Sequence, residues 1–333
     1  MAADFHFSLL ENGLDFLLSS LEHLTAASAY PKTPVEKIRQ AADQKRHLKY
    51  ALIHLCSSIE LIFKERLRQE HWTLVFKDIS KASRDAYDSG DFQSVTFQEA
   101  QDRLVGICEI EFTQNQRRDL KNLRDRRNKV EHFGAVDSLL AVQASVSKMV
   151  SFLVDFVEEA FEQESLEEEE SLIADVRSML GNCDAVVKQR WKEIQDQVDK
   201  QYSSIECPTC QQKALSADGG TVKCLFCNYA ADSKSAADEY VSNILGFHSR
   251  YATEKDGDDW PLTTCPDCGS ETFVTQVPGP YDTHNSYCFN CGQEYQAGEL
   301  ETCYDCGELY DPGEEKGHHI CTDCFRARVN KDD

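Results

Sequence analysis

The sequence predicts a mainly α-helical protein, in which an N-terminal helical bundle is followed by a helical linker and by small β-rich metal-binding modules. Three observations predict this. Apolar residues recur at helical spacing up to about residue 165, an acidic run ends that region, and twelve of the fifteen cysteines lie in pairs towards the C-terminus. We expect a helical domain over 1–165, a linker over 166–203, modules over 204–232, 263–298 and 299–329, and a linker over 233–262.

The helices of the first domain follow from their apolar spacing. Residues Leu10–Leu24 mark one helix, and Leu48–Ile62 mark a second helix whose broad apolar arc predicts a central position. Pro34 suits the start of this second helix, with Thr33 as its N-cap. Three further helices are expected: a short one over 97–110, a basic one over 114–133 that ends near Gly134, and a long apolar one over 139–157.

The segment after the bundle is also predicted to be helical. The block Glu167–Glu170 is typical of a solvated boundary. A heptad-like stripe then predicts a helix that either packs back on the bundle or associates with a second copy; its members are Val187, Trp191, Ile194 and Val198. Between the first two modules we expect a helix over 236–245 and a loop over 256–259.

Six C-x-x-C pairs predict three four-cysteine metal sites. The members are Cys207, Cys210, Cys224, Cys227, Cys265, Cys268, Cys288, Cys291, Cys303, Cys306, Cys321 and Cys324. Two turns of this kind supply the tetrahedral sulfur shell that zinc accepts, so we expect three structural zinc ions. Iron–sulfur clusters are the alternative, but regular pairing with Pro208 and Pro266 inside the turns favours zinc ribbons. Disulfides need an oxidising compartment, whereas the N-terminal MAADFHFSLL lacks an export signal, which predicts a cytoplasmic protein.

The assignment of cysteine pairs to ions has two solutions. Sequential ribbons, which we favour, use neighbouring pairs; a cross-braced arrangement would join the pair at Cys265 to that at Cys303, and the pair at Cys288 to that at Cys321. His318 and His319 are possible competing ligands, but the thiolate sets are complete without them. The remaining cysteines, Cys56, Cys108 and Cys183, stand alone in helical patterns and are expected to pack as small apolar residues.

The charge distribution restricts the possible partners. The net charge of −23 argues against a membrane role and, for most of the surface, against nucleic acid. One predicted helix departs from this pattern, because basic residues gather between residues 117 and 129. We expect this helix to contact RNA phosphates through Arg117, Arg118, Lys121 and Arg124.

Near the end of the same helix the sequence Arg-Asn-Lys-Val-Glu-His, residues 127–132, gives the pattern R-N-x-x-x-H. With this motif in an all-helical domain, residues 5–165 resemble the HEPN superfamily, and the zinc region lies outside the resemblance. The resemblance implies a metal-independent endoribonuclease that acts as a homodimer, with two motifs forming one cleft. It implies catalytic roles for Arg127, Asn128 and His132, and a place among toxins or antiviral effectors.

Helix geometry limits how one chain could use this motif. Asn128 and His132 lie on one face, whereas residues five apart, such as Arg127 and His132, are rotated by roughly 140°. A second copy would bring the arginine of one chain to the histidine of the other. The non-catalytic alternatives are an ion pair of Arg127 with Glu131 and a role for His132 as a cation at the helix C-terminus.

Two further interpretations remain open. Glu60 on the central helix is either an additional polar member of the site or the partner of Lys64 in a salt bridge. The whole protein is either a nuclease with a zinc-ribbon array for recruitment, or a non-catalytic dimeric adaptor that binds RNA or protein. The acidic ribbons favour a protein partner there.

Overall fold

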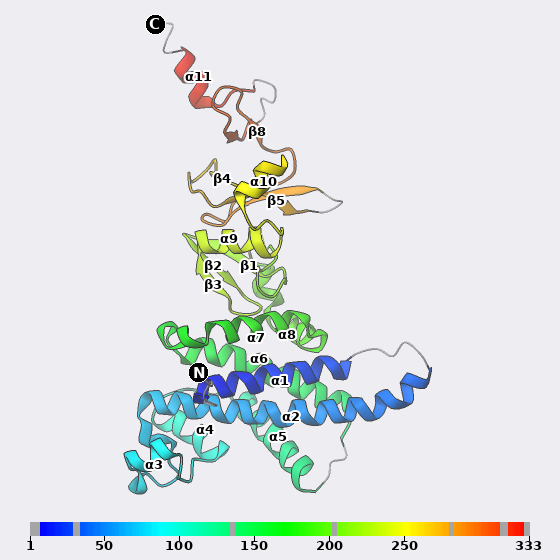
Figure 1. The fold of residues 1–333 in the computed structure, drawn as a ribbon, viewed down its shortest axis with the longest axis vertical. Helices are drawn as coiled ribbons and strands as arrows, with labels where there is room; N and C mark the ends of the chain where they lie inside the picture. Colours follow the sequence, from blue (N-terminus) through cyan, green and yellow to red (C-terminus); the bar gives the residue numbers. More distant parts are fainter. Residues whose placement is uncertain are drawn as a thin grey trace. The chain divides into compact units, whose positions relative to one another are not determined.

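The computed structural model describes residues 7–28, 34–133, 137–201, 205–279, 283–313 and 319–329 (Figure 1). Gly134, His318 and Thr33, which figure in the sequence expectations, lie outside these residues. The chain divides into two compact units, residues 1–193 and 194–333. The first is helical and the second contains the cysteine modules, as the sequence predicts.

The first unit is built around a helical hairpin. Helix α1 (Leu9–Ser28) packs along α2 (Pro34–Glu70), which also contacts α4 (Phe97–Gly106), α5 (Gln114–His132) and α6 (Leu139–Ala160), so the predicted central position of α2 is confirmed (Figure 1). The helix start at Pro34 is also confirmed. Between α2 and α4 lie the short helices η1 (Trp72–Val75), η2 (Ile79–Lys81) and α3 (Arg84–Ser89).

Small residues allow α1 and α2 to approach closely. A Cβ added to Gly13 would stand 2.8 Å from Ile62 Cγ1, so only hydrogen fits there. The buried Ser58 hydroxyl donates to the Gly13 carbonyl at 2.6 Å, and Ser20 donates to Ala51 O at 2.8 Å. These bonds satisfy polar groups that the close packing removes from water.

Capping residues fix where α4 and α5 begin. Thr96 and Glu99 form a reciprocal capping box at α4, and Thr113 and Gln116 form one at α5. The helix predicted over 97–110 ends at Gly106, four residues early. Helix α5 matches its predicted span within one residue.

Residues 166–193 belong to the first unit, so the predicted linker over 166–203 is wrong for this part of the chain. After η3 (Gln163–Glu169), α7 (Glu170–Asn182) packs against α1. Arg190 of helix α8 (Asp184–Val198) is 1% exposed and connects this helix to α6. Its guanidinium donates to Ser151 Oγ at 2.9 Å and forms an ion pair of 2.9 Å with Asp155. The first part of α8 therefore packs back on the bundle, which is one of the two expected outcomes.

Among the described helices, α6 alone is long and apolar enough to cross a membrane. Its buried side chains include Val150, Leu153 and Val157, and it packs against α2 and α5. This packing is that of a core helix in a helical bundle.

The described residues of the second unit form three small antiparallel sheets. The first has the order β1 (Leu215–Asp218), β2 (Thr221–Cys224), β3 (Ala230–Asp232), and α9 (Ser233–Asn243) follows it. The second has the order β4 (Leu262–Thr263), β5 (Phe273–Pro278), β6 (His284–Cys288), β7 (Glu294–Tyr295). The third pairs β8 (Glu301–Thr302) with β9 (Leu309–Tyr310), before α11 (Thr322–Val329).

The helix expected over 236–245 corresponds to α9. The loop expected over 256–259 begins one residue late, because Asp256 ends a short helix, α10 (Arg250–Asp256). Gly257 closes this helix in the left-handed conformation, with φ of 92°.

Candidate functional site

The twelve paired cysteines form three groups of four. In each group all four Sγ atoms lie within 4.8 Å of one another, and each group unites two neighbouring pairs; the groups are Cys207/Cys210/Cys224/Cys227, Cys265/Cys268/Cys288/Cys291 and Cys303/Cys306/Cys321/Cys324. The sequential assignment is therefore confirmed, and the cross-braced alternative is wrong. In the first two modules, short antiparallel strands between the two pairs bring the second pair back to the first.

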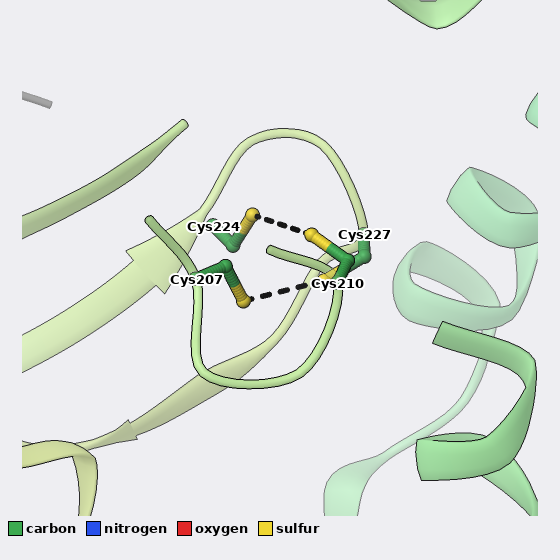
Figure 2. Close-up of side chains that lie close together, drawn as sticks. All are labelled: Cys207, Cys210, Cys224 and Cys227. Atoms are coloured by element: carbon green, nitrogen blue, oxygen red, sulfur yellow. Dashed lines mark hydrogen bonds between the residues drawn. The ribbon is translucent and has the colours of Figure 1, made fainter. Parts of the chain in front are cut away.

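The sulfur separations fit a tetrahedral ion. In the first module Cys207 Sγ lies 3.8 Å from Cys227 Sγ, and Cys210 Sγ lies 3.8 Å from Cys224 Sγ (Figure 2). A four-coordinate ion with metal–sulfur bonds of about 2.3 Å places its sulfurs about 3.8 Å apart. In the second module, the Sγ atoms of Cys265 and Cys291 are 3.9 Å apart, and those of Cys268 and Cys288 are 3.7 Å apart. In the third module, the Sγ atoms of Cys306 and Cys321 are 3.9 Å apart.

Each C-x-x-C turn is made by the backbone. The residue after the second cysteine donates its N–H to the carbonyl of the first, for example Gln211 to Cys207 at 2.9 Å. In five of the six turns this residue has a positive φ; the five are Gln211, Asn228, Gly269, Gly292 and Gly307. Gly269 and Gly292 stand out in the sequence as turn residues, but Gln211 and Asn228 do not. The sixth turn differs because Cys324 lies inside α11.

The three sites differ in their access to solvent. All four cysteines of the first group are buried, two of the second are exposed, and in the third group Cys303 alone is buried. In the first group, burial and then hydrogen bonds with the neighbouring sulfurs raise the pKa of Cys227 well above its usual value. A bound cation would offset that penalty and stabilise the thiolate form.

The R-N-x-x-x-H residues lie near the C-terminal end of α5, but they do not converge within one chain. Asn128 and His132 are exposed, as their shared face predicts. Arg127 is partly buried, and its Nη1 pairs with Glu131 Oε2 at 2.9 Å, which is the ion pair named as an alternative. In the part of the chain that the structure describes, neither Asn128 nor His132 has a side-chain hydrogen-bond partner.

Arg127 lies close to α2. Burial raises the pKa of Cys56 on α2 to about 12, while the nearby guanidinium of Arg127 lowers it. The Cys56 thiol is therefore neutral and packs as expected for a buried apolar residue. Glu60, also on α2, pairs with Lys64 at 2.6 Å, so the salt-bridge interpretation is confirmed for this pair.

Most of the basic side chains on α5 are held by neighbouring groups. Arg117 donates to Phe112 O at 3.0 Å, Arg118 to Asn115 at 3.0 Å, and Arg124 to Gln98 at 2.5 Å. Lys121 is exposed and has no partner among the described residues. Of the four predicted RNA contacts, Lys121 is thus the one that needs no rearrangement to meet a phosphate.

Two exposed apolar side chains flank the end of α5. Phe133 directly follows His132 and is 92% exposed, and Leu140 in the first turn of α6 is 74% exposed. Large side chains with this exposure suit contact with another surface. Periodicity did not single them out, because both lie at helix ends where the apolar stripe is interrupted.

A comparison with known proteins adds no relative: no protein-family model, curated protein or solved structure matches this chain.

Proposed function

We propose that the chain is a metal-independent endoribonuclease of the HEPN type that acts as a homodimer. The observation that supports this most is that Asn128 and His132, at the end of α5, are exposed and have no partner among the described residues. This helix contains seven basic and three acidic residues and so has a net charge of +4, although the net charge of the whole chain is −23. Such a helix end combines a titratable imidazole with local attraction for phosphate.

The proposed reaction is attack of a ribose 2′-hydroxyl on the adjacent phosphate. Neutral His132 takes the hydroxyl proton or, once protonated, returns one to the leaving 5′-oxygen. Arg127 stabilises the charge that grows on the phosphate oxygens, and Asn128 orients the phosphate. The products carry a 2′,3′-cyclic phosphate, and no metal takes part in the step.

A second copy completes this site in our proposal. Phe133 and Leu140 supply apolar surface beside the motif, and a two-fold axis there would bring the two α5 ends together. Phe133→Glu should then give a monomer by light scattering. A wild-type protein that is already monomeric at micromolar concentration would contradict the composite cleft.

We also propose zinc as the ion of all three cysteine groups, because the sulfur separations match its bond length and the sites offer no open position. None of the fifteen cysteines is in a disulfide, which fits the cytoplasm, where thiols stay reduced. By its resemblance the protein would serve in defence, as a toxin or antiviral effector, with the zinc ribbons recruiting a partner or the substrate.

The competing proposal is a non-catalytic dimeric adaptor. The Arg127–Glu131 ion pair favours it, because this pair engages the guanidinium that the nuclease would need to bind phosphate. The exposure of Tyr304 (84%) and Phe325 (59%) on the third module also favours it. These aromatic residues could contact a protein partner.

Cleavage of total RNA by the purified chain distinguishes the two proposals. Loss of a general acid–base group costs about 10²–10⁴-fold in rate, so His132→Ala should lose that much. His248→Ala, an exposed histidine of the second unit, is the matched control and should cleave normally. Equal cleavage by His132→Ala and wild type would favour the adaptor. Products with 3′-hydroxyl ends would rule out attack by the 2′-hydroxyl.

A further inference from the structure

A cavity of about 280 Å³ lies in the first unit, between the start of α5 and the second half of α6. The loop before α5 contributes Glu111 and Phe112, and α6 contributes Phe152, Phe156 and Glu159. The three α6 residues follow one another at spacings of four and three, so they lie on the same face of the helix. We call this space the aromatic cavity.

Three phenylalanine rings form the apolar part of the aromatic cavity. The ring centroid of Phe112 lies 6.2 Å from those of Phe152 and Phe156, which are 5.9 Å from each other. Phe112 and Phe156 are 6% and 5% exposed, so they form the floor. Phe152 is only partly buried, so its ring is the one that an occupant can reach. An accessible phenylalanine ring attracts a cation that lies within about 6 Å of its centroid.

The charged groups of this cavity all have one sign. Among its nine described lining residues, three are acidic and none is basic. Asp155 pairs with Arg190 at 2.9 Å. The other two, Glu111 and Glu159, are exposed, and their carboxylates have no partner among the residues that the structure describes. Two available carboxylates beside an accessible ring favour a cationic occupant with an apolar or planar body.

A second, acidic cavity adjoins the aromatic one. Its volume is about 890 Å³, and Glu159 and Ala160 line both cavities. Seven of its described lining residues are glutamates and two are arginines, so this lining has a net charge of −5. The two arginines are already held by glutamates of the same cavity, Arg66 at 3.3 Å and Arg68 at 2.6 Å. An occupant of both cavities therefore needs several cations spaced along a chain.

We propose that the two cavities together bind an arginine-rich segment of a partner protein. One arginine side chain enters the aromatic cavity, and further basic side chains lie along the acidic one. The aromatic cavity is smaller than the roughly 300–1,000 Å³ of drug-sized sites, which suits a single side chain. Arginine fits better than lysine, because its planar, weakly hydrated guanidinium stacks on a ring and binds carboxylates through two parallel hydrogen bonds.

This site is separate from the R-N-x-x-x-H motif. Gln116, which also lines the aromatic cavity, lies in the first turn of α5, whereas His132 ends this helix. At a rise of 1.5 Å per residue the two positions are about 24 Å apart along the helix axis. Binding of the partner therefore does not depend on RNA cleavage, and the two proposals can fail independently.

Calorimetric titration of the full chain with a capped peptide tests the proposal. The probe has three arginines separated by single glycines, and in the matched probe citrulline, a neutral isostere, replaces each arginine. The citrulline peptide should bind at least about tenfold more weakly, because it forms no charge-assisted hydrogen bonds. A lysine peptide should also bind more weakly than the arginine peptide. Equal binding of the arginine and citrulline peptides, or no binding at millimolar concentration, overturns the proposal.

Two charge variants separate this site from the general negative charge of the chain. Glu111→Gln and Glu159→Gln should each weaken binding of the arginine peptide about two- to fivefold. Their thermal midpoints should equal that of the wild type, because both side chains are exposed and lack a partner among the described residues. Glu22→Gln removes the same charge from an exposed position on α1 and is the control. Equal affinities for all three variants would mean that the cavities do not hold the peptide.

Phe152→Leu tests the ring. Leucine keeps the position apolar but offers no ring face to a guanidinium, so the preference for the arginine peptide over the lysine peptide should disappear. Because this preference is a ratio within one variant, a modest loss of stability does not affect it. Spermidine, which carries the same charge as the peptide, should compete poorly. An unchanged preference in Phe152→Leu, or displacement of the peptide by an equal concentration of spermidine, would overturn the proposal.

Discussion

Arg127 and Glu131 form an ion pair of 2.9 Å between successive turns of α5, and the pair holds the guanidinium along its own helix. The side chains are only 24% and 28% exposed. The Arg127 guanidinium can contact a phosphate in two ways. It can bind the phosphate while it keeps the ion pair with Glu131, or the ion pair can break first. For the function proposed above, Glu131 would therefore limit the affinity of Arg127 for RNA, although the motif itself does not contain Glu131.

The first prediction concerns this pair. Glu131→Gln removes the competing charge, so RNA affinity at low salt should rise roughly two- to fivefold, the scale of a partly exposed ion pair. Filter binding at two salt concentrations measures the change. Glu22→Gln, which removes the same charge from an exposed position on α1, is the control. Unchanged binding in Glu131→Gln would mean that Arg127 does not contact RNA.

The second prediction concerns metal removal. Small modules have little core, and metal binding supplies about 10–16 kcal/mol of their folding free energy. Native mass spectrometry should show three zinc ions, and a chelator should remove the ion of the third group first, because its cysteines are the most accessible. Circular dichroism should show that the helices of the first unit persist. Simultaneous loss of all three ions, or of the helical signal, would contradict this.

The third prediction concerns three histidines between α1 and α2. His23 Nδ1 lies 3.0 Å from His47 Nδ1, and the ring centroid of His54 lies 5.3 Å from that of His23. Burial first, and then His54 and His47, lower the pKa of His23; burial also lowers the pKa of His54, against the opposing charge of Asp15. Glu22 raises and Arg46 lowers the pKa of His23 more weakly.

Because the folded state resists protonation at His23 and His54, the unfolded state binds more protons once the pH falls through about 6.5. The stability of the first unit should therefore be fully present above this pH and decrease below it. Thermal midpoints between pH 8 and pH 5 measure the effect, and His23→Gln should flatten it. If the thermal midpoint changes with pH in His23→Gln as it does in the wild type, groups other than His23 cause the pH effect.

The fourth prediction concerns the contact between α1 and α2. Gly13→Ala forces a methyl group to within 2.8 Å of Ile62 Cγ1, and overpacking of this kind costs about 1–3 kcal/mol. Gly106→Ala is the matched control, because nothing lies within 4 Å of the added Cβ at the end of α4. It should be neutral or slightly stabilising. Urea denaturation compares the two, and equal stabilities would contradict the close approach.

Local patterns predicted the helical part well. Apolar spacing placed α1, α2, α5 and α6, because the side that faces the core repeats with the helical period. The capping boxes of α4 and α5 fix where these helices begin, because each box is made by residues only three positions apart. The prediction of a linker over 166–203 is wrong for residues 166–193. These residues belong to the first unit because α7 packs against α1 and Arg190 binds residues of α6, and both partners are distant in sequence.

The sequence by itself determined the candidate metal ligands and the nature of the two units. C-x-x-C turns are local, and so is helical periodicity; both follow from the conformation of a few successive residues. Only the tertiary structure decided which cysteine pairs share a site and that Arg127 pairs with Glu131 beside α2. The physical reason is that these relationships depend on packing between separate elements, where burial and competition among partners select one arrangement from several that the sequence permits.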